Sequence, residues 1–275
     1  MDQSVIAFIG AGNMGRSLAG GLLKSGWDRR TLLLADPIDE QRRAVERLLG
    51  VSVYGDNNEA AARADVLVLA VKPQVMRKVC EGLAGTVQEK APLIVSIAAG
   101  VRIADLERWL GGRVPLVRAM PNTPALVSSG ASGLFANPQV GAPQRDLAES
   151  ILRTVGVTVW LPDEALLDLV TALSGSGPAY FFLVMEALER AATEQGLDPK
   201  TARLLTLETA FGAAKMALEG GTEPAELRRR VTSPGGTTER AIAVLQDGNV
   251  EELFNKAIEA ACDRSRELAD MLGRD

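Results

Sequence analysis

A short apolar run that leads directly into a glycine-rich turn is the feature that most limits how this chain can fold. Residues 5–9 (Val-Ile-Ala-Phe-Ile) are followed at once by Gly10-Ala11-Gly12-Asn13-Met14-Gly15 and then by an amphipathic stretch, residues 16–24. A strand, a turn and a helix in this order are the context in which G-x-G-x-x-G binds the pyrophosphate of a dinucleotide. The chain is therefore predicted to begin with a nucleotide-binding unit.

Each glycine of this motif has a physical task. Gly10 permits the tight turn, Gly12 lets the backbone approach the pyrophosphate, and Gly15 allows the helix to pack closely on the strand. The helix N-terminus adds amide donors and the positive end of its dipole. The predicted cofactor-binding residues of the turn are Gly10, Gly12, Asn13, Met14 and Gly15.

Asp36 lies 21 residues beyond Gly15, at the position where an acid accepts hydrogen bonds from the ribose hydroxyls of adenosine. This interpretation favours NADH over NADPH. The opposite interpretation is that Asp36 caps the next helix through Asp36-Pro37, and that Arg42 or Arg43 reaches a 2′-phosphate. The sequence thus predicts NADPH or NADH as the cofactor.

Further apolar runs predict a parallel sheet. They occupy residues 32–35, 66–71, 93–97 and 115–119. Continuous runs of this length suit strands that are covered on both faces, with helical crossovers between them. Two shorter runs, residues 133–136 and 157–160, are expected to extend the sheet at one edge. The predicted fold class is α/β, with an N-terminal Rossmann-type doubly wound parallel sheet.

The strand pattern stops after Leu161-Pro162, and the remaining residues show helical patterns bounded by glycine and proline. Helices are expected at residues 178–195, 199–219, 223–230, 235–246 and 251–272. The predicted domains are a dinucleotide-binding domain over 1–161 and an all-helical substrate-binding and dimerisation domain over 162–275. The helix expected at 199–219 is apolar around more than one face, so it must be buried. A domain this small scarcely surrounds it unaided, which predicts a homodimer.

Composition excludes several classes of function. A net charge of -5 and a pI near 5.1 leave no broad basic surface for nucleic acid. The N-terminal residues lack a cationic region, and no apolar run reaches the roughly 18 residues that span a bilayer. Two distant cysteines fit a reducing compartment, so we expect a cytoplasmic protein. Because there is no histidine, no metal site is predicted, and the chemistry must proceed without imidazole.

Two loops follow predicted strands at the edge of the sheet where open α/β folds bind ligands. Ala70-Val71-Lys72-Pro73 follows the third strand, and Ser96-Ile97-Ala98-Ala99-Gly100 follows the fourth. The first is expected to line the cofactor, and the small residues of the second leave room for a nicotinamide or a ribose. The alternative for both is simple tight packing. The cofactor contacts predicted here are Ala70, Val71, Lys72, Pro73, Ala98, Ala99 and Gly100.

The segment Val231-Thr232-Ser233-Pro234-Gly235-Gly236-Thr237-Thr238 is the most unusual stretch. We interpret Ser233 as a helix N-cap, Pro234 as the first helical residue, and the glycines as part of the first turn. Each glycine in a helix interior costs roughly 1 kcal/mol against alanine, so a need for close backbone approach is expected. Free amides, the helix dipole and two hydroxyls suit a substrate carboxylate. The alternative is an ordinary capped helix.

Ser174-Gly175-Ser176-Gly177-Pro178 interrupts an apolar helical pattern and then begins a new helix. It is either a flexible joint or a place where a ligand meets the backbone. On the second interpretation Ser174 and Gly175 contact the substrate.

Six segments together resemble the pyrroline-5-carboxylate reductase family, whose members perform the last step of proline synthesis. The resemblance covers nearly the whole chain, and its last two segments are specific to the family. The segments are Phe8-Ile9-Gly10-Ala11-Gly12-Asn13-Met14, Ala70-Val71-Lys72-Pro73, Ala98-Ala99-Gly100, Met120-Pro121-Asn122-Thr123-Pro124, Leu173-Ser174-Gly175-Ser176-Gly177-Pro178-Ala179-Tyr180 and residues 231–238.

The resemblance implies an NAD(P)H-dependent oxidoreductase that acts on a C=N bond. It also implies an active site between a Rossmann domain and a helical dimerisation domain, and dimers that often assemble into larger rings. The residue roles that it implies are cofactor contacts for Asn57 and the loop 70–73, a place near the substrate ring for Glu164, and binding of the substrate carboxylate by Ser233, Gly236, Thr237 and Thr238. Arg230 departs from the asparagine of some relatives, and Gly15 is often alanine in them.

The implied chemistry needs few side chains. Hydride from nicotinamide C4 adds to the C5 imine carbon of pyrroline-5-carboxylate, and positioning is the main contribution of the protein. A cyclic imine is basic enough to arrive protonated, so the absence of histidine is no obstacle. Thr238 is expected to orient the ring nitrogen.

Two alternatives stay open. The first is another reductase of similar architecture, such as an imine reductase or a 3-hydroxyacid dehydrogenase. The latter usually needs an interdomain lysine, and residues 163–195 contain none. The second is a non-catalytic nucleotide-sensing or scaffold protein, against which the intact segment 231–238 argues.

Overall fold

The computed structural model describes residues 4–274, which form two compact units. Unit 1 holds the chain up to Ser176 together with the segment from Ala260 onward, and unit 2 is Gly177–Glu259. The predicted division at 161/162 follows the end of the strands and stays a prediction. Compactness divides the chain later, because α7 packs on the sheet of unit 1 and the C-terminal segment contacts α7 and residues 100–108 of the same unit.

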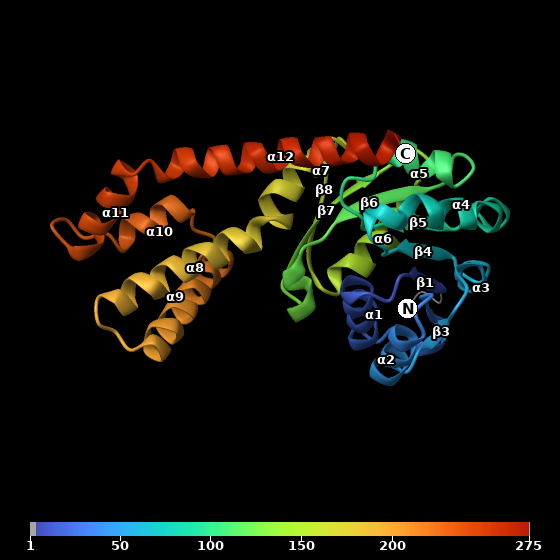
Figure 1. Cartoon of the computed structure of the whole chain (residues 1–275), viewed down its shortest axis with the longest axis horizontal. Helices are drawn as coiled ribbons and strands as arrows, with labels where there is room; N and C mark the ends of the chain where they lie inside the picture. The colour runs from blue at the N-terminus through green and yellow to red at the C-terminus, as the bar shows by residue number, and fades with distance from the viewer. Residues whose placement is uncertain (1–3, 275) are drawn as a thin grey trace. The chain divides into compact units, whose positions relative to one another are not determined.

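Unit 1 is built on one eight-stranded sheet with the order β3-β2-β1-β4-β5-β6-β7-β8 (Figure 1). Its strands are β1 Ile6–Ile9, β2 Leu32–Ala35, β3 Ser52–Tyr54, β4 Val66–Leu69, β5 Leu93–Ser96, β6 Leu116–Met120, β7 Gly130–Ala136 and β8 Gly156–Trp160. Every neighbouring pair is parallel except β6 and β7, which are antiparallel. From β1 the sheet grows first toward β2 and β3 on one side and then toward β4 and β5 on the other. The change of side between β1 and β4 is the topological switch point of a doubly wound fold.

The helices of unit 1 cover both faces of this sheet. They are α1 Asn13–Lys24, α2 Asp39–Leu49, α3 Asn57–Ala61, α4 Pro73–Lys90, α5 Ile103–Trp109, α6 Ala142–Arg153 and α7 Leu166–Val170, with short 3₁₀ turns η1 Arg29–Thr31 and η2 Thr123–Val127 and a π-helix η3 Thr171–Gly175.

Alternation along β1 divides the interior of unit 1 into two cores. Ile6 and Phe8 belong to a cluster that contains Leu18 of α1 and Ile151 of α6. Ala7 and Ile9 belong to the opposite cluster, which contains Met76, Cys80 and Leu83 of α4. Successive side chains of a strand point to opposite faces, so a strand of four buried residues requires cover on both sides.

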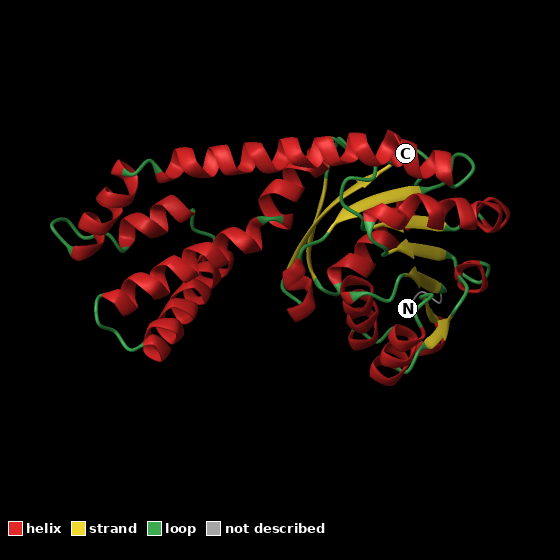
Figure 2. Ribbon diagram, in the orientation of Figure 1, coloured by secondary structure: helices red, strands yellow, loops and turns green. Residues whose placement is uncertain are grey.

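Unit 2 is wholly helical (Figure 2). Its helices are α8 Gly177–Glu194, α9 Pro199–Gly220, α10 Pro224–Arg230 and α11 Thr237–Asp247, and α12 Val250–Arg274 begins there and ends in unit 1. Proline stands in the first turn of α9 and of α10, where its missing N–H breaks no helical hydrogen bond. By length and composition, one described helical stretch, Leu166–Glu194, is long and apolar enough to cross a membrane.

The predicted fold class is confirmed, and its differences from the structure lie at the edges of the sheet. All five predicted buried strands are present, the third ending at Leu69 instead of Val71. The short strand β3 was not expected, because its residues are partly exposed and form no apolar run. The antiparallel placement of β7 was also not predicted, since an edge strand of either direction shows the same local pattern.

Candidate functional site

The glycine turn lies at the switch point between β1 and β4. Gly10 has φ +104°, and a Cβ there would lie 2.8 Å from the carbonyl oxygen of Ala70. A Cβ at Gly15 would overlap the carbonyl oxygen of Gly10. Gly12 differs, because a Cβ there would meet no atom within 4 Å. The turn is therefore closed on the protein side by Gly10 and Gly15 and open at Gly12.

The open side of the turn carries the start of α1. Gly12 is the N-cap of this helix, and no side chain caps it. The first amides of an α-helix have no partner within the helix, so those at Asn13 and Met14 are available to an anion. A cavity of about 570 Å³ lies along α1 beyond this point, and its lining includes Asn13, Arg16 and Arg29.

Asp36 follows β2 and binds two backbone amides. Its Oδ2 accepts from Ala11 N–H at 3.0 Å, and its Oδ1 accepts from Ile38 N–H at 2.9 Å. The first bond ties the carboxylate to the glycine turn. The second organises the turn before α2, although Ile38, and not Asp36, is the N-cap of that helix. Asp36 is therefore adjacent to the nucleotide turn and also has a structural task there.

The two arginines of α2 differ in how firmly they are held. Arg42 donates from Nη1 to the carbonyl oxygens of Asp36 and Pro37, both at 2.9 Å, and its side chain is 25% exposed. Both arginines pair with Asp39, at 3.0 Å from Arg42 and 2.9 Å from Arg43, but Arg43 has no other polar partner among residues 4–274 and is 70% exposed. The fixed cation beside Asp36 is therefore Arg42, whereas Arg43 lies on a solvated helix face.

Asn57 is the first residue of α3. The adjacent Asn58 donates to Gly82 O at 3.2 Å and accepts from Thr86 Oγ1 at 2.6 Å, so it joins α3 to α4. The half-buried side chain of Asn57 makes no hydrogen bond to any other part of residues 4–274. Asn57 is thus available to a ligand, while Asn58 is structural.

The two predicted loops meet at the carboxyl edge of the sheet. A cavity of about 610 Å³ is lined by Pro73 and Gln74 at the start of α4, by Ala99 and Gly100 after β5, by Thr171 and Ser176, and on its far wall by Ala261, Arg264, Ser265, Leu268, Met271 and Leu272. The sequence did not indicate Thr171 or the residues of α12. No local pattern marks the α12 residues, because the return of residues 260–274 to unit 1 brings them to the cavity.

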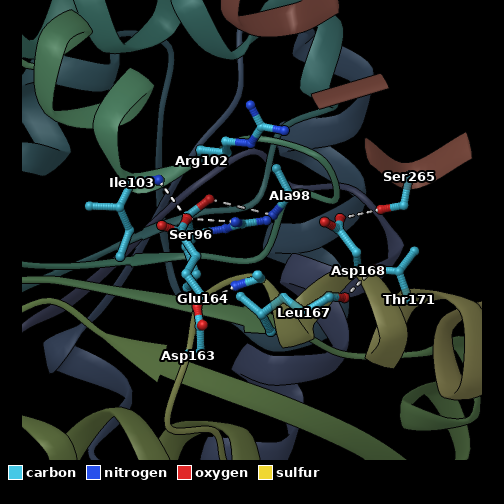
Figure 3. A network of polar contacts seen from close by, with 12 residues as sticks. Ser96, Ala98, Arg102, Ile103, Asp163, Glu164, Leu167, Asp168, Thr171 and Ser265 are labelled. Carbon is cyan, nitrogen blue, oxygen red and sulfur yellow. Dashed lines mark hydrogen bonds and ion pairs between the residues drawn. The ribbon is translucent and has the colours of Figure 1, made fainter. Parts of the chain in front are cut away.

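Glu164 lies in a polar network at the same edge of the sheet (Figure 3). Its Oε1 accepts from the Ile103 amide at 2.8 Å and from Arg118 Nη1 at 2.6 Å. The Arg118 side chain on β6 is 9% exposed and that of Glu164 is 26% exposed. The buried cation thus holds the carboxylate through one oxygen, and the partly exposed group keeps acceptor capacity on the other.

The same network holds the end of α12 on unit 1. Ser265 Oγ donates to Asp168 Oδ1 at 2.7 Å, as Figure 3 shows. Arg102 pairs with Asp270 at 2.7 Å, and Arg108 donates to Gly273 O at 2.8 Å. These contacts explain why the C-terminal segment forms one wall of the cavity.

The segment at the start of α11 corrects the predicted capping. The helix begins at Thr237, its N-cap is Gly236, and Gly235 has φ +70°. The glycines therefore form the turn before the helix, and Ser233 is not the N-cap. Gly236 N–H donates to Ser233 O at 3.0 Å, and Gly235 N–H donates to Glu239 Oε2 at 2.7 Å. A left-handed φ favours glycine, which explains the glycine at position 235.

The amides at Thr237 and Thr238 belong to the first turn of an 11-residue helix and have no partner within it. Ser233, Gly236, Thr237 and Thr238 lie together around this end of unit 2. Glu164, Ser174 and Gly175 lie in unit 1. The first group suits an anion, and Ser174 and Gly175 of the second group lie in sequence between Thr171 and Ser176, which line the cavity at the sheet edge.

Two family models match different parts of the chain. Residues 164–268 match the model described as pyrroline-5-carboxylate reductase dimerisation, and residues 5–100 match the model described as NADP oxidoreductase coenzyme F420-dependent. The second match covers the glycine turn and both strand-end loops.

Named relatives match over the full length. The pyrroline-5-carboxylate reductase of Pseudomonas aeruginosa is 54% identical over 274 residues, which is 100% of each chain. The solved structure of a pyrroline-5-carboxylate reductase from Coxiella burnetii has a TM-score of 0.93 at 48% identity and covers 97% of this chain and 99% of that chain. The structure of Plasmodium falciparum pyrroline carboxylate reductase with NADP bound has a TM-score of 0.86 at 28% identity and covers 98% of this chain and 99% of that chain.

Proposed function

The chain belongs to the pyrroline-5-carboxylate reductase family, and on that premise we propose that it reduces 1-pyrroline-5-carboxylate to L-proline with a reduced nicotinamide dinucleotide. The observation that carries this proposal is the 54% identity over the whole length to a pyrroline-5-carboxylate reductase. The aligned residues span both units, so they include the nucleotide turn as well as the helical segment 231–238.

The residues at the switch point fit a dinucleotide. The space beside Gly12 is empty, and without a Cβ there a pyrophosphate can approach the backbone closely. The start of α1, which no side chain caps, offers amides to the same group. We assign Gly10, Gly12, Asn13, Met14 and Gly15 to this contact. Asn57, the loop 70–73 and Ala98, Ala99 and Gly100 are assigned to the rest of the cofactor, since several of them line one cavity.

NADPH is the proposed cofactor ahead of NADH. Asp36 already accepts two backbone amides, and Arg42 is fixed beside it as a cation that a 2′-phosphate would share with Asp39, to which Arg42 is paired at 3.0 Å. One relative was solved with NADP bound, and residues 5–100 match the model described as NADP oxidoreductase coenzyme F420-dependent.

The start of α11 is the proposed site of the substrate carboxylate. Its free amides and dipole favour an anion, and the hydroxyls of Ser233, Thr237 and Thr238 add donors. Thr238 is assigned the orientation of the ring nitrogen. Glu164, held by Arg118, is assigned to the cationic imine ring, and Ser174 and Gly175 to contacts with the substrate through their backbone.

The reaction needs positioning more than acid–base groups. When bound, the reduced dinucleotide supplies the hydride that adds to C5 of the imine. The protein binds the carboxylate, places Glu164 so that its negative charge favours the iminium form, and orients the ring. No imidazole is required for any of these tasks.

We propose a homodimer through unit 2, assembled further into a ring of dimers. The match to a dimerisation model covers this unit, and its helices expose many apolar side chains. Those exposed residues also explain the apolar stretch Leu166–Glu194, of which only 17% of the most apolar window is buried within the chain. A partner subunit, and not a membrane or a nucleic acid, is the proposed cover, in a cytoplasmic enzyme.

The test is to follow oxidation of NADPH and of NADH by the purified protein with and without pyrroline-5-carboxylate. Substrate-dependent oxidation, faster with NADPH, is expected. No oxidation with either cofactor would reject the proposal in favour of another cyclic imine or a non-catalytic role.

The Thr238→Ala variant tests the assigned carboxylate and ring contacts. We expect a higher KM or a lower kcat with an unchanged Kd for NADPH. Thr222→Ala, which alters another threonine near a helix start in unit 2, is the control and should behave as the wild type. Equal loss of cofactor binding in Thr238→Ala would reject the assignment.

A further inference from the structure

The segment that contains Ser174 and Gly175 is a π-helix, Thr171–Gly175, between α7 and α8. Its defining bond runs from Ser176 N–H to Thr171 O at 2.8 Å, across five residues instead of four. Such turns are rare, occur mostly as single turns inside α-helices, and are frequently found at functional sites. The wider turn requires its own stabilisation, because it gives up the regular helical bonding of its carbonyl groups.

Proline is the sequence cause of one missing bond. In an uninterrupted α-helix the carbonyl of Ser174 would accept the amide proton of residue 178. Residue 178 is a proline and has no N–H. The Ser174 carbonyl, in a part-buried position, therefore needs a donor from elsewhere.

Asn122 is that donor. Its Nδ2 donates to Ser174 O at 3.0 Å, and its Oδ1 accepts from Ala131 N–H at 2.9 Å. The two partners fix the orientation of the amide, because a carbonyl can pair only with the NH₂ group and an N–H only with the oxygen. Asn122 thus connects β7 to the π-helix through one side chain.

A second residue of the same motif contacts the same segment. A Cβ at Gly175 would lie 2.6 Å from Met120 Cε, so Met120 packs directly against the backbone of Gly175. Met120 is the last residue of β6, and Asn122 is the N-cap of η2. The motif Met120-Pro121-Asn122, which lies more than fifty positions earlier in the sequence, therefore supports both Ser174 and Gly175.

We propose that Asn122 is a positioning residue for the substrate: it supplies the hydrogen bond that Pro178 cannot, and so holds Ser174 and Gly175 in the geometry that the reaction uses. This inference rests on the proposed function, because it assigns Asn122 a part in the same reaction. Asn122 itself need not touch the substrate or the cofactor.

The test replaces Asn122 by aspartate. Asn122→Asp keeps an oxygen for Ala131 N–H but places a second carboxylate oxygen against Ser174 O, where a donor stood. Asn137→Asp is the matched control. Asn137 is 5% exposed, accepts from Leu116 N–H at 3.1 Å, and donates to Val114 O at 2.8 Å and Glu107 Oε1 at 3.0 Å. It makes the same kind of bonds in unit 1 but none to the π-helix.

Both variants are assayed as the full-length assembly at a temperature where each is folded. For Asn122→Asp we expect kcat/KM for pyrroline-5-carboxylate to fall by about 10- to 100-fold, while the Kd for NADPH changes by less than about twofold. Backbone hydrogen exchange of residues 171–177 should rise. For Asn137→Asp, a lower Tm is expected with near wild-type kcat/KM and unchanged exchange in that segment.

Two results would overturn the positioning role: equal losses of kcat/KM in the two variants, or unchanged exchange of residues 171–177 in Asn122→Asp. If Asn122→Asp does not fold, Asn122→Ala is measured in its place, since it removes the same donor without adding charge. Absence of turnover by the wild type rejects the proposed function instead, which the wild-type assay reveals before any variant is compared.

Discussion

The two units of this chain differ in how they bury their apolar side chains. Unit 1 places four-residue strands such as β1 and β4 fully inside, between two clusters of side chains from helices on either face. Within Gly177–Glu259, all of which is described, Ala202 is the one buried residue of the apolar core. The same stretch exposes Phe181, Phe182, Leu204, Leu205 and Phe211, among others.

This difference indicates that unit 1 is stabilised by its own core and unit 2 by association. Burial of apolar area is the main favourable contribution to folding, so a helical unit that leaves its large side chains exposed lacks that contribution as a single copy. Helix α9 is long, and its apolar side chains cover more than one face and lie exposed in the single chain, which fits burial against a second copy.

The largest effect is expected from Phe211→Asp. Phe211 on α9 is 64% exposed in the single chain, and burying a carboxylate at a subunit interface is costly, so the dimer Kd should rise by about 100-fold or more. Analytical ultracentrifugation measures the change in mass, and turnover should be lost with it. Leu48→Asp, at a 68% exposed position of α2, is the control and should leave the mass unchanged. A full-mass Phe211→Asp protein would contradict the division between the two units.

A smaller effect is expected from two glycine substitutions in unit 1. Gly10→Ala forces a left-handed φ and a contact of 2.8 Å on Ala70 O, so it should lower the free energy of unfolding by about 2 kcal/mol. Gly12→Ala meets no atom within 4 Å and should leave stability unchanged while weakening NADPH binding. Urea unfolding and cofactor titration separate the two results. Equal destabilisation by both would contradict the assignment of Gly12 to the ligand side.

Trp160→Phe tests a contact within unit 1 that depends on pH. The indole N–H of Trp160 donates to Glu149 Oε2 at 2.8 Å and is the main reason why the pKa of Glu149 lies below its ordinary value. A lowered folded-state pKa stabilises the protein above the ordinary pKa, and this contribution is lost as the pH falls through the folded-state value. The variant should be less stable by less than about 1 kcal/mol at pH 7, with the difference vanishing in acid.

Unfolding free energies at pH 7 and at several acidic values check this prediction. Trp109→Phe is the control, because the Trp109 indole N–H has no hydrogen-bond partner among the described residues. Its effect on stability should not depend on pH. A pH-independent loss in Trp160→Phe as well would contradict the role of the Glu149 contact.

The smallest effect is expected for the alkylation rate of Cys80, which should not change when the assembly is broken. Burial raises the pKa of the Cys80 thiol to about 12, so its alkylation at pH 8 should be at least about 100-fold slower than that of a free cysteine. Peptide mass spectrometry after iodoacetamide treatment measures it. The thiol should stay as slow in Phe211→Asp, since the core around it belongs to unit 1 alone. Rapid labelling in that variant would show that the core of unit 1 depends on the partner.

Local patterns predicted most of unit 1 and the helices of unit 2. Residues 5–9 and 66–71 are apolar without interruption, which identifies buried strands, and Gly10 marks the turn because few other residues fit its positive φ and close contacts. The helix starts with proline at Pro199 and Pro224 follow from the same kind of local rule. The capping at residues 233–238 was predicted wrongly, because a glycine before a helix and a glycine in its first turn look alike in sequence.

The sequence by itself determined the nucleotide turn, the strands beside it and the apolar helices that need a partner, because each depends on neighbours a few residues away. Only the tertiary structure decided the direction of β7, the return of α12 to unit 1, and the pairing of Arg118 with Glu164 and of Asn122 with Ser174. The two side-chain pairs join residues that are 46 and 52 positions apart, and no periodic pattern in the sequence predicts them. Their partners are chosen by the packing of whole elements, which places polar groups within hydrogen-bonding distance after the core has formed.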